Sequence, residues 1–257
     1  MVASHESHTV TQTDSTQALC SYLDWDSEFF HCRIGRLESS RLDEQVIAQA
    51  LEWAQVNHID CLYFLADPNH SQTVRLAQDN KFLPVDVRLI FGRPVPAEPG
   101  PKVSSVRFAR EDDLPALRAI AAKSHSDTRF YFDRHFDRSR CDQLYETWIE
   151  NSFHGFAQAV LVVERGTMPA GYVTLHKRDE EARIGLIAVA PGHQGAGLGR
   201  LLVEQSLEWA RQQAATKMKV VTQGRNVAAQ RLYQRCGFLT DSFEIWYHRW
   251  FGTAGKE

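Results

Sequence analysis

The stretch that decides the fold runs from Ala182 to Ala214 and reads ARIGLIAVAPGHQGAGLGRLLVEQSLEWARQQA. Its first part is an apolar run that predicts a strand, and its last part has the apolar periodicity of an amphipathic helix. The glycine-rich turn GHQGAGLGR lies between them. Glycines let the backbone approach a ligand closely, and the free N–H groups of the first helical turn point at an anion. The stretch therefore predicts a pyrophosphate-binding loop between a strand and a helix.

Two common phosphate-binding motifs do not fit this turn. A Walker loop needs Lys followed by Ser or Thr at the helix entry, where this chain has Gly199-Arg200, and a dinucleotide fingerprint needs a third glycine in place of Arg200. The pattern that fits is Gln194-x-x-Gly197-x-Gly199. It resembles the acyl-CoA signature of the Gcn5-related N-acetyltransferases (GNAT). A glycine-rich turn that binds no ligand is the alternative interpretation.

The resemblance implies acetyl-CoA as a co-substrate. In the family, the strand before the loop separates from its neighbour, and its free amides hold the pantetheine arm. The residues of this chain at the matching cofactor-binding positions are Ile187, Ala188, Val189, Gln194, Gly195, Ala196, Gly197, Leu198, Gly199, Arg200 and Asn226.

A second motif, QGRNVAAQRLYQRCGF, runs from Gln223 to Phe238. Asn226 can cap a helix, and Tyr233 follows about two helical turns later on the same face. The resemblance implies that Asn226 contacts the pantetheine arm and that Tyr233 protonates the departing sulfur. A phenol suits that task, because its pKa is close to that of a thiol. A core aromatic with no catalytic role is the alternative for Tyr233.

Candidates for the general base are Glu164, His176 and Asp179, each of which could equally be a solvated surface residue.

An internal repeat with a shift of 156 positions aligns Leu51–Arg93 with Leu207–Arg249 without gaps. Both copies predict helix, strand, helix and strand. In the first copy, the positions that match Gln194 and the three glycines carry Glu38, Ser39, Arg41 and Asp43. Carboxylates at these positions disfavour an anionic pyrophosphate. We therefore expect the first half to bind no CoA.

The expected fold class is α/β, a mixed sheet with flanking helices: a GNAT fold preceded by a partial, degenerate GNAT-like domain. The proline-rich segment RPVPAEPGPK, residues 93–102, predicts a stiff linker. The expected organisation is a disordered tail (1–18), the partial N-terminal domain (19–93), the linker (94–102), the catalytic domain (103–251) and a short tail (252–257).

The composition limits the classes of protein to which this chain can belong. The 257 residues are 43% hydrophobic and 24% charged, with a net charge of −3, which is typical of a globular protein and argues against nucleic acid as the main partner. No apolar run is long enough for a membrane span, and the N-terminus lacks the apolar core of a signal peptide. The five scattered cysteines suggest reduced thiols rather than a metal site. We expect a cytoplasmic protein without a bound metal.

The segment HSDTRFYFDRHF, His125–Phe136, carries four aromatics and several charges. Aromatic rings can stack on a sugar or base, and arginine can pair with phosphate. Thr128–Gly155 and the earlier LDWDSEFFHCRIGRL resemble the TDP-fucosamine acetyltransferases. That resemblance implies a nucleotide-linked amino sugar, such as TDP-4-amino-4,6-dideoxygalactose, as the acceptor in bacterial polysaccharide biosynthesis. Arg129 and Tyr131 are then the expected substrate contacts.

Two other functions stay open at this point. One is an acetyltransferase acting on a protein N-terminus or another small amine. The other is a non-catalytic acyl-CoA-binding module, which would need the glycine loop but not Tyr233. The oligomeric state is also open, with a homodimer among the alternatives.

Overall fold

The computed structural model describes residues 18–100 and 103–252. Contacts between Cα atoms divide them into two units: one holds the residues up to Val87 and from Phe243 onward, and the other is Arg88–Ser242. This division differs from the expected limits 19–93 and 103–251, because two strands each contribute residues to both units. The expected tails 1–18 and 252–257 lie, apart from their inner residues Ala18 and Gly252, outside the described part of the chain.

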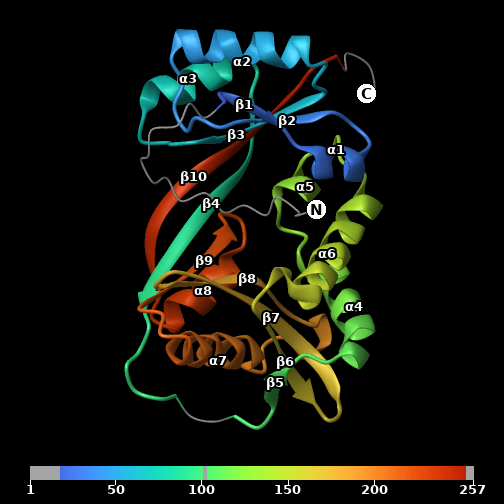
Figure 1. The fold of residues 1–257 in the computed structure, drawn as a ribbon, viewed down its shortest axis with the longest axis vertical. Coiled ribbons are helices and arrows are strands. Elements are labelled where there is room, and N and C mark those ends of the chain that lie inside the picture. The colour runs from blue at the N-terminus through green and yellow to red at the C-terminus, as the bar shows by residue number, and fades with distance from the viewer. Residues whose placement is uncertain (1–17, 101–102, 253–257) are drawn as a thin grey trace. The chain divides into compact units, whose positions relative to one another are not determined.

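The first unit contains strands in the order β1-β2-β3-β10. They are β1 (Cys20–Tyr22), β2 (Ile34–Leu37), β3 (Cys61–Ala66) and the end of β10 (Leu239–Trp250), with helices α1 (Asp24–Phe30), α2 (Glu44–Val56) and α3 (Ser71–Asp79). β2 runs parallel to β3, and Ile245–Trp250 of β10 pairs antiparallel with β3. The last strand of the chain therefore completes a sheet built from the first half of the chain (Figure 1).

The second unit contains strands in the order β4-β9-β8-β7-β6-β5. They are β4 (Leu83–Pro94), β5 (Val106–Phe108), β6 (Ala159–Arg165), β7 (Met168–Arg178), β8 (Glu181–Val189) and β9 (Lys217–Gln223). Its helices are η1 (Glu111–Asp113), α4 (Leu114–Ser124), α5 (Arg129–Phe132), α6 (Arg138–Asn151), η2 (Ser152–Phe156), η3 (Pro191–His193), α7 (Leu198–Gln212) and α8 (Val227–Arg235). Arg88–Pro94 of β4 pairs antiparallel with β9, so the first half of the chain contributes a strand here in return.

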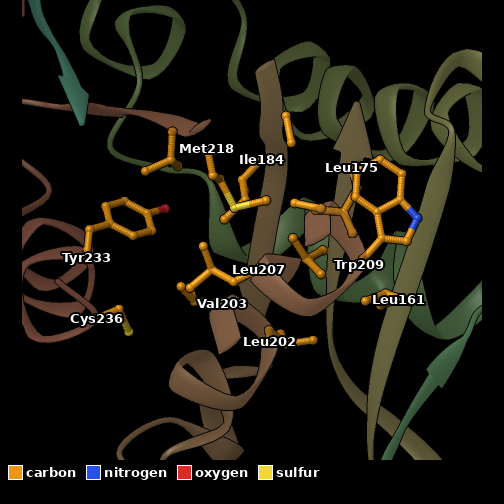
Figure 2. Packing of buried hydrophobic residues seen from close by; sticks show 14 of the residues in the cluster. Leu161, Leu175, Ile184, Leu202, Val203, Leu207, Trp209, Met218, Tyr233 and Cys236 are labelled. Atoms are coloured by element: carbon orange, nitrogen blue, oxygen red, sulfur yellow. The ribbon is translucent and has the colours of Figure 1, made fainter. Parts of the chain in front are cut away.

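The core of the second unit forms between α7 and the strands, because the apolar stripe of α7 faces the sheet. Figure 2 shows side chains of α7 packed among those of β6, β7, β8 and β9, with Tyr233 and Cys236 at one side. The labelled residues from α7 and the strands are Leu161, Leu175, Ile184, Leu202, Val203, Leu207, Trp209 and Met218, all at most 6% exposed. This packing fixes the direction of α7 and of the glycine loop that leads into it.

The internal repeat is visible in the element bounds. With the shift of 156 positions, α3 coincides with α8 and β4 coincides with β10 along their whole lengths, while β3 and β9 begin at equivalent residues. β4 and β10 are thus equivalent strands, and each extends into the other unit. The mixed α/β fold expected from the sequence is confirmed, and the exchange of strands between the units is an addition to it.

Candidate active site

The site begins at a break in the pairing of β8. The parallel ladder of β8 with β9 covers Glu181–Ile184, and among the described residues the two strands form no pair beyond Ile184. On the other side, Ile187–Val189 pair with β7. Between Ile184 and Ile187 the register with β7 shifts by one residue, which is a β-bulge. The edge of β8 that faces β9 is therefore open to an added extended chain from Gly185 onward.

Two residues stabilise this bulge. The Leu186 amide donates a hydrogen bond of 2.7 Å to the hydroxyl of Thr174, which is fully buried on β7. Gly185 is exposed in the middle of β8, and a Cβ built on it would lie 2.7 Å from Thr174 Oγ1 and 2.7 Å from His176 Nε2. Only glycine fits at this position without displacing those side chains. A glycine inside a strand pattern is the sequence signal that indicates such a bulge.

The glycine loop follows directly from β8. Gly195 and Gly197 have φ angles of 77° and 80°, a conformation that side chains disfavour, and nothing would lie within 4 Å of a Cβ on either residue. Pro191–Gly197 is exposed, and the Gln194 amide donates to the Val189 carbonyl at 3.2 Å. Gly197 is the N-cap of α7, whose first turn has no capping side chain and no acidic residue. This helix start can therefore accept an anion.

The equivalent helix start in the first unit is different. The N-cap of α2 is Asp43, whose carboxylate accepts a hydrogen bond of 2.7 Å from the Val46 amide, and Glu44 follows in the first turn. Arg41, just before this cap, is bound to Asp67 at 3.0 Å. A carboxylate of the chain already uses the N–H groups that a pyrophosphate would need. That the first half binds no CoA remains a prediction, and this geometry supports it.

Asn226 and Tyr233 lie on α8, as expected. The Asn226 side chain caps the helix, accepting from the Ala229 amide at 2.9 Å. Tyr233 is 2% exposed and its ring lies 5.9 Å from that of Phe91, so the ring packs in the core. Its hydroxyl points toward Met218 and Ile184, on β9 and β8 (Figure 2). Burial raises the pKa of Tyr233, so the phenol carries its proton at neutral pH.

The structure separates the three candidates for the general base. Glu164 forms an ion pair of 2.7 Å with Arg107, and the side chain of Asp179 is 90% exposed next to the β7–β8 turn. His176 is half-buried on β7, with its Nε2 packed against the exposed Gly185. Of the three, His176 alone is placed beside the bulge by these contacts.

The segment expected to bind the acceptor folds partly on itself. Arg129 is 6% exposed and its guanidinium lies 4.2 Å from the centre of the Phe130 ring. The Tyr131 hydroxyl donates to Asp142, and burial is the main cause of a raised pKa of Tyr131. Phe132 is exposed, and the Arg225 guanidinium lies 4.2 Å from its ring centre. The Phe132–Arg225 contact, which joins this segment to the turn before Asn226, was not predicted. Substrate binding by Arg129 and Tyr131 stays a prediction.

A buried histidine at the end of α4 gives a prediction for stability against pH. His125 shares a hydrogen bond of 2.9 Å with the Tyr172 hydroxyl and stacks on Tyr145, and burial lowers its pKa from 6.5 to about 4. Between those values the unfolded chain binds a proton that the folded chain does not. As the pH falls from 7 to 4, the wild type should lose about 3 kcal/mol more unfolding free energy than His125→Asn.

Urea unfolding at pH 7, 5.5 and 4 measures this difference. His154→Asn, at an exposed position on η2, is the matched control and should follow the wild type. Parallel pH dependence in wild type and His125→Asn would show that His125 is not held neutral.

No helix within the described residues has the length and apolarity of a membrane span. In the same part of the chain, no three His, Cys, Asp or Glu side chains gather as metal ligands.

Comparison with known proteins places these features in a family. Residues 117–238 match the sequence model of the Acetyltransferase (GNAT) family. Spore coat polysaccharide biosynthesis protein SpsD of Bacillus subtilis (strain 168) is 30% identical over 56% of this chain and 50% of its own. The dTDP-fucosamine acetyltransferase of Escherichia coli O6:H1 is 33% identical over 57% of this chain and 63% of its own. The matches thus span about half to two-thirds of these relatives.

A solved structure agrees on the fold. A GCN5-related N-acetyltransferase from Sphaerobacter thermophilus superposes with a TM-score of 0.60 at 12% identity, covering 90% of this chain and 76% of its own. At that identity the likeness concerns the fold alone. The match over residues 117–238 assigns this part of the chain, which holds the strand–loop–helix site, to the GNAT acetyltransferase family, and the superposition shows the same fold.

Proposed function

We propose that this chain is an acetyl-CoA-dependent N-acetyltransferase. The observation that carries the proposal is the continuity of three features: the bulge at Gly185, the open edge of Ile187–Val189, and the uncapped start of α7 at Gly197. The α7 amides and the exposed loop fit a pyrophosphate, and the edge of β8 fits a pantetheine arm bound like an added strand. Asn226, at the start of α8, is the proposed further contact with that arm.

The proposed chemistry is direct transfer to an amine. Acetyl-CoA, when bound, supplies the acetyl group as a thioester. We expect the amides of Ile187–Val189 that face the open edge to stabilise negative charge on the carbonyl oxygen, which is a large term in acyl transfer. Tyr233 is protonated at neutral pH because burial raises its pKa, so it can give a proton to the leaving sulfur.

The proposed acceptor is the amine of a nucleotide-linked amino sugar, such as TDP-4-amino-4,6-dideoxygalactose. Two relatives support this class, since one is named a dTDP-fucosamine acetyltransferase and the other a spore coat polysaccharide biosynthesis protein. Phe132, next to the half-buried Tyr131, supports it as well, because its exposed ring offers a stacking face to a sugar or a base.

The test is CoA release from acetyl-CoA with a panel of amines: the TDP-linked amino sugar, the same sugar without the nucleotide, and peptides with free N-termini. We expect the nucleotide-linked sugar to have the highest kcat/KM. Preference for peptides would overturn the acceptor class and leave the acetyltransferase proposal standing. Binding of acetyl-CoA without CoA release for any amine would favour a non-catalytic acyl-CoA-binding module.

Arg129→Ala tests the expected phosphate contact. Losing one charge-assisted hydrogen bond costs about 1.5–3 kcal/mol, so kcat/KM for the nucleotide-linked sugar should fall roughly 10- to 150-fold relative to the free sugar. Because the ratio of the two substrates is taken within one variant, a loss of folded protein from this buried position cancels. Arg178→Ala, at an exposed position, is the control and should leave the ratio unchanged. An unchanged ratio in Arg129→Ala would return Arg129 to a packing role against Phe130.

A further inference from the structure

We propose that His176 is the general base that removes a proton from the acceptor amine. The inference rests on the proposed acetyl transfer and adds to it a residue with a defined role. An alkyl amine with a pKa near 10 is mostly protonated at neutral pH, and an ammonium has no lone pair with which to attack. A base near the acetyl group is therefore needed.

The position of His176 on β7 is the first argument. Successive side chains of a strand point to opposite faces. Val173 and Leu175 belong to the core cluster with α7, so Thr174 and His176 face the other way. That is the face of Tyr172, whose hydroxyl bonds to His125 at the end of α4. His176 thus lies on the face of the sheet that carries the segment proposed to bind the acceptor.

The close contact between His176 and the exposed bulge residue Gly185 supports the same role. Gly185 is exposed although its strand lies between β7 and β9, and a Cβ there would be 2.7 Å from His176 Nε2 and 3.0 Å from Cδ2. The ring edge that carries Nε2, the nitrogen that would take the proton, therefore packs against the exposed backbone of Gly185. Gly185 adjoins Leu186 and Ile187, where β8 leaves β9 and where the thioester is proposed to lie.

The surroundings of His176 keep its ring oriented and neutral. The ring of Phe156, on η2, packs edge-on at 5.4 Å, and Arg183 is the cross-strand partner on β8. Burial first, and then the charge of Arg183, lower the pKa of His176. Arg183 itself is bound to Glu181 at 2.6 Å, and Lys219 of β9 reaches the same carboxylate at 2.7 Å. At pH 7 to 8 the ring is therefore in the form that accepts a proton.

His176 Nε2 takes the first proton from the ammonium and later releases it to solvent. The free amine then forms the new bond to the acetyl carbon, and the carbon–sulfur bond breaks as Tyr233 gives a proton to the sulfur. The nitrogen loses its second proton to solvent as it becomes the neutral amide, and Tyr233 regains one proton from solvent. No oxidant, metal or further co-reactant is required.

His176→Gln tests the proposal, because glutamine keeps hydrogen-bonding groups but cannot take the proton. With an alkyl amine acceptor at pH 7.5, kcat should fall by roughly 10²–10⁴ while the Kd for acetyl-CoA stays within a few-fold. With an acceptor whose amine pKa lies below 6, such as an aryl amine or an alkoxyamine, the defect should shrink to a few-fold, because that amine is already unprotonated. His154→Gln, at an exposed position two residues before Phe156, is the matched control and should match the wild type with both acceptors.

A second readout needs no turnover. NMR titration of the ring in the full chain should show His176 neutral at pH 7, with its protonation midpoint below 6.5. An unchanged kcat in His176→Gln, an equal loss with both acceptors, or a ring protonated at pH 7 would overturn the proposal while leaving acetyl transfer intact. Failure of the wild type to acetylate any amine would instead contradict the proposed function.

Discussion

Replacing Gly197 with aspartate is expected to abolish acetyl-CoA binding. Gly197 is exposed, has a φ of 80°, and caps the start of α7, and a Cβ at this position would have nothing within 4 Å. An aspartate there would place a carboxylate on the N–H groups proposed for the pyrophosphate, as Asp43 does at the start of α2. A side chain at this positive φ is strained, so the loss is compared with that of a variant that carries a similar strain away from the site.

Isothermal calorimetry measures this effect. The parent is expected to bind with a micromolar Kd, about −8 kcal/mol, and the variant to bind at least about 100-fold more weakly. Gly166→Asp is the matched control, because Gly166 also has a positive φ, 63°, and open space around it, but lies in the β6–β7 turn. It should bind like the parent. If Gly197→Asp binds as tightly as Gly166→Asp, the proposed cofactor loop is misplaced.

Tyr233→Phe is expected to lower kcat by roughly 10²–10⁴ with little change in the Kd for acetyl-CoA. The substitution keeps the ring that packs against Phe91 and Phe238 and removes only the hydroxyl. Since that hydroxyl is protonated and points toward β8 and β9, its loss removes a proton donor while the core stays filled. Rapid-quench measurement of the transfer step, with thermal melting as a check on folding, gives the comparison.

Tyr247→Phe is the control for removing a buried hydroxyl. Tyr247 is 1% exposed, its pKa is also raised by burial, and it belongs to the first unit. Its variant should keep the parental kcat. A Tyr233→Phe variant with an unchanged rate of the chemical step would return Tyr233 to the role of a core aromatic.

The local features of the site could be predicted from the sequence because they depend on local chemistry. The glycine loop and the helix after it follow from residues that are adjacent in the chain, and the cap at Asn226 needs only contacts within one helical turn. The gap-free repeat indicated equivalent elements in both halves, and β4 and β10 are such a pair. Such features are set by backbone freedom, capping and apolar periodicity.

The features that were not predicted depend on contacts between distant residues. β4 and β10 are equivalent in the repeat, so the sequence alone does not say which sheet each strand joins. The burial of Arg129 over Phe130 and the contact of Arg225 with Phe132 depend on how the acceptor segment packs. Gly185 carried a local signal, a glycine in an apolar strand, but its meaning needed the positions of Thr174 and His176 on the neighbouring strand.

The most direct test of the central claim is the stoichiometry of acetyl-CoA binding to the intact chain, measured by calorimetric titration. We expect one molecule per chain, because the start of α7 is open whereas that of α2 is capped by Asp43. Two molecules per chain would show that the first half also binds the co-substrate. No binding at all would contradict the assignment of Gln194–Arg200 as the acyl-CoA loop.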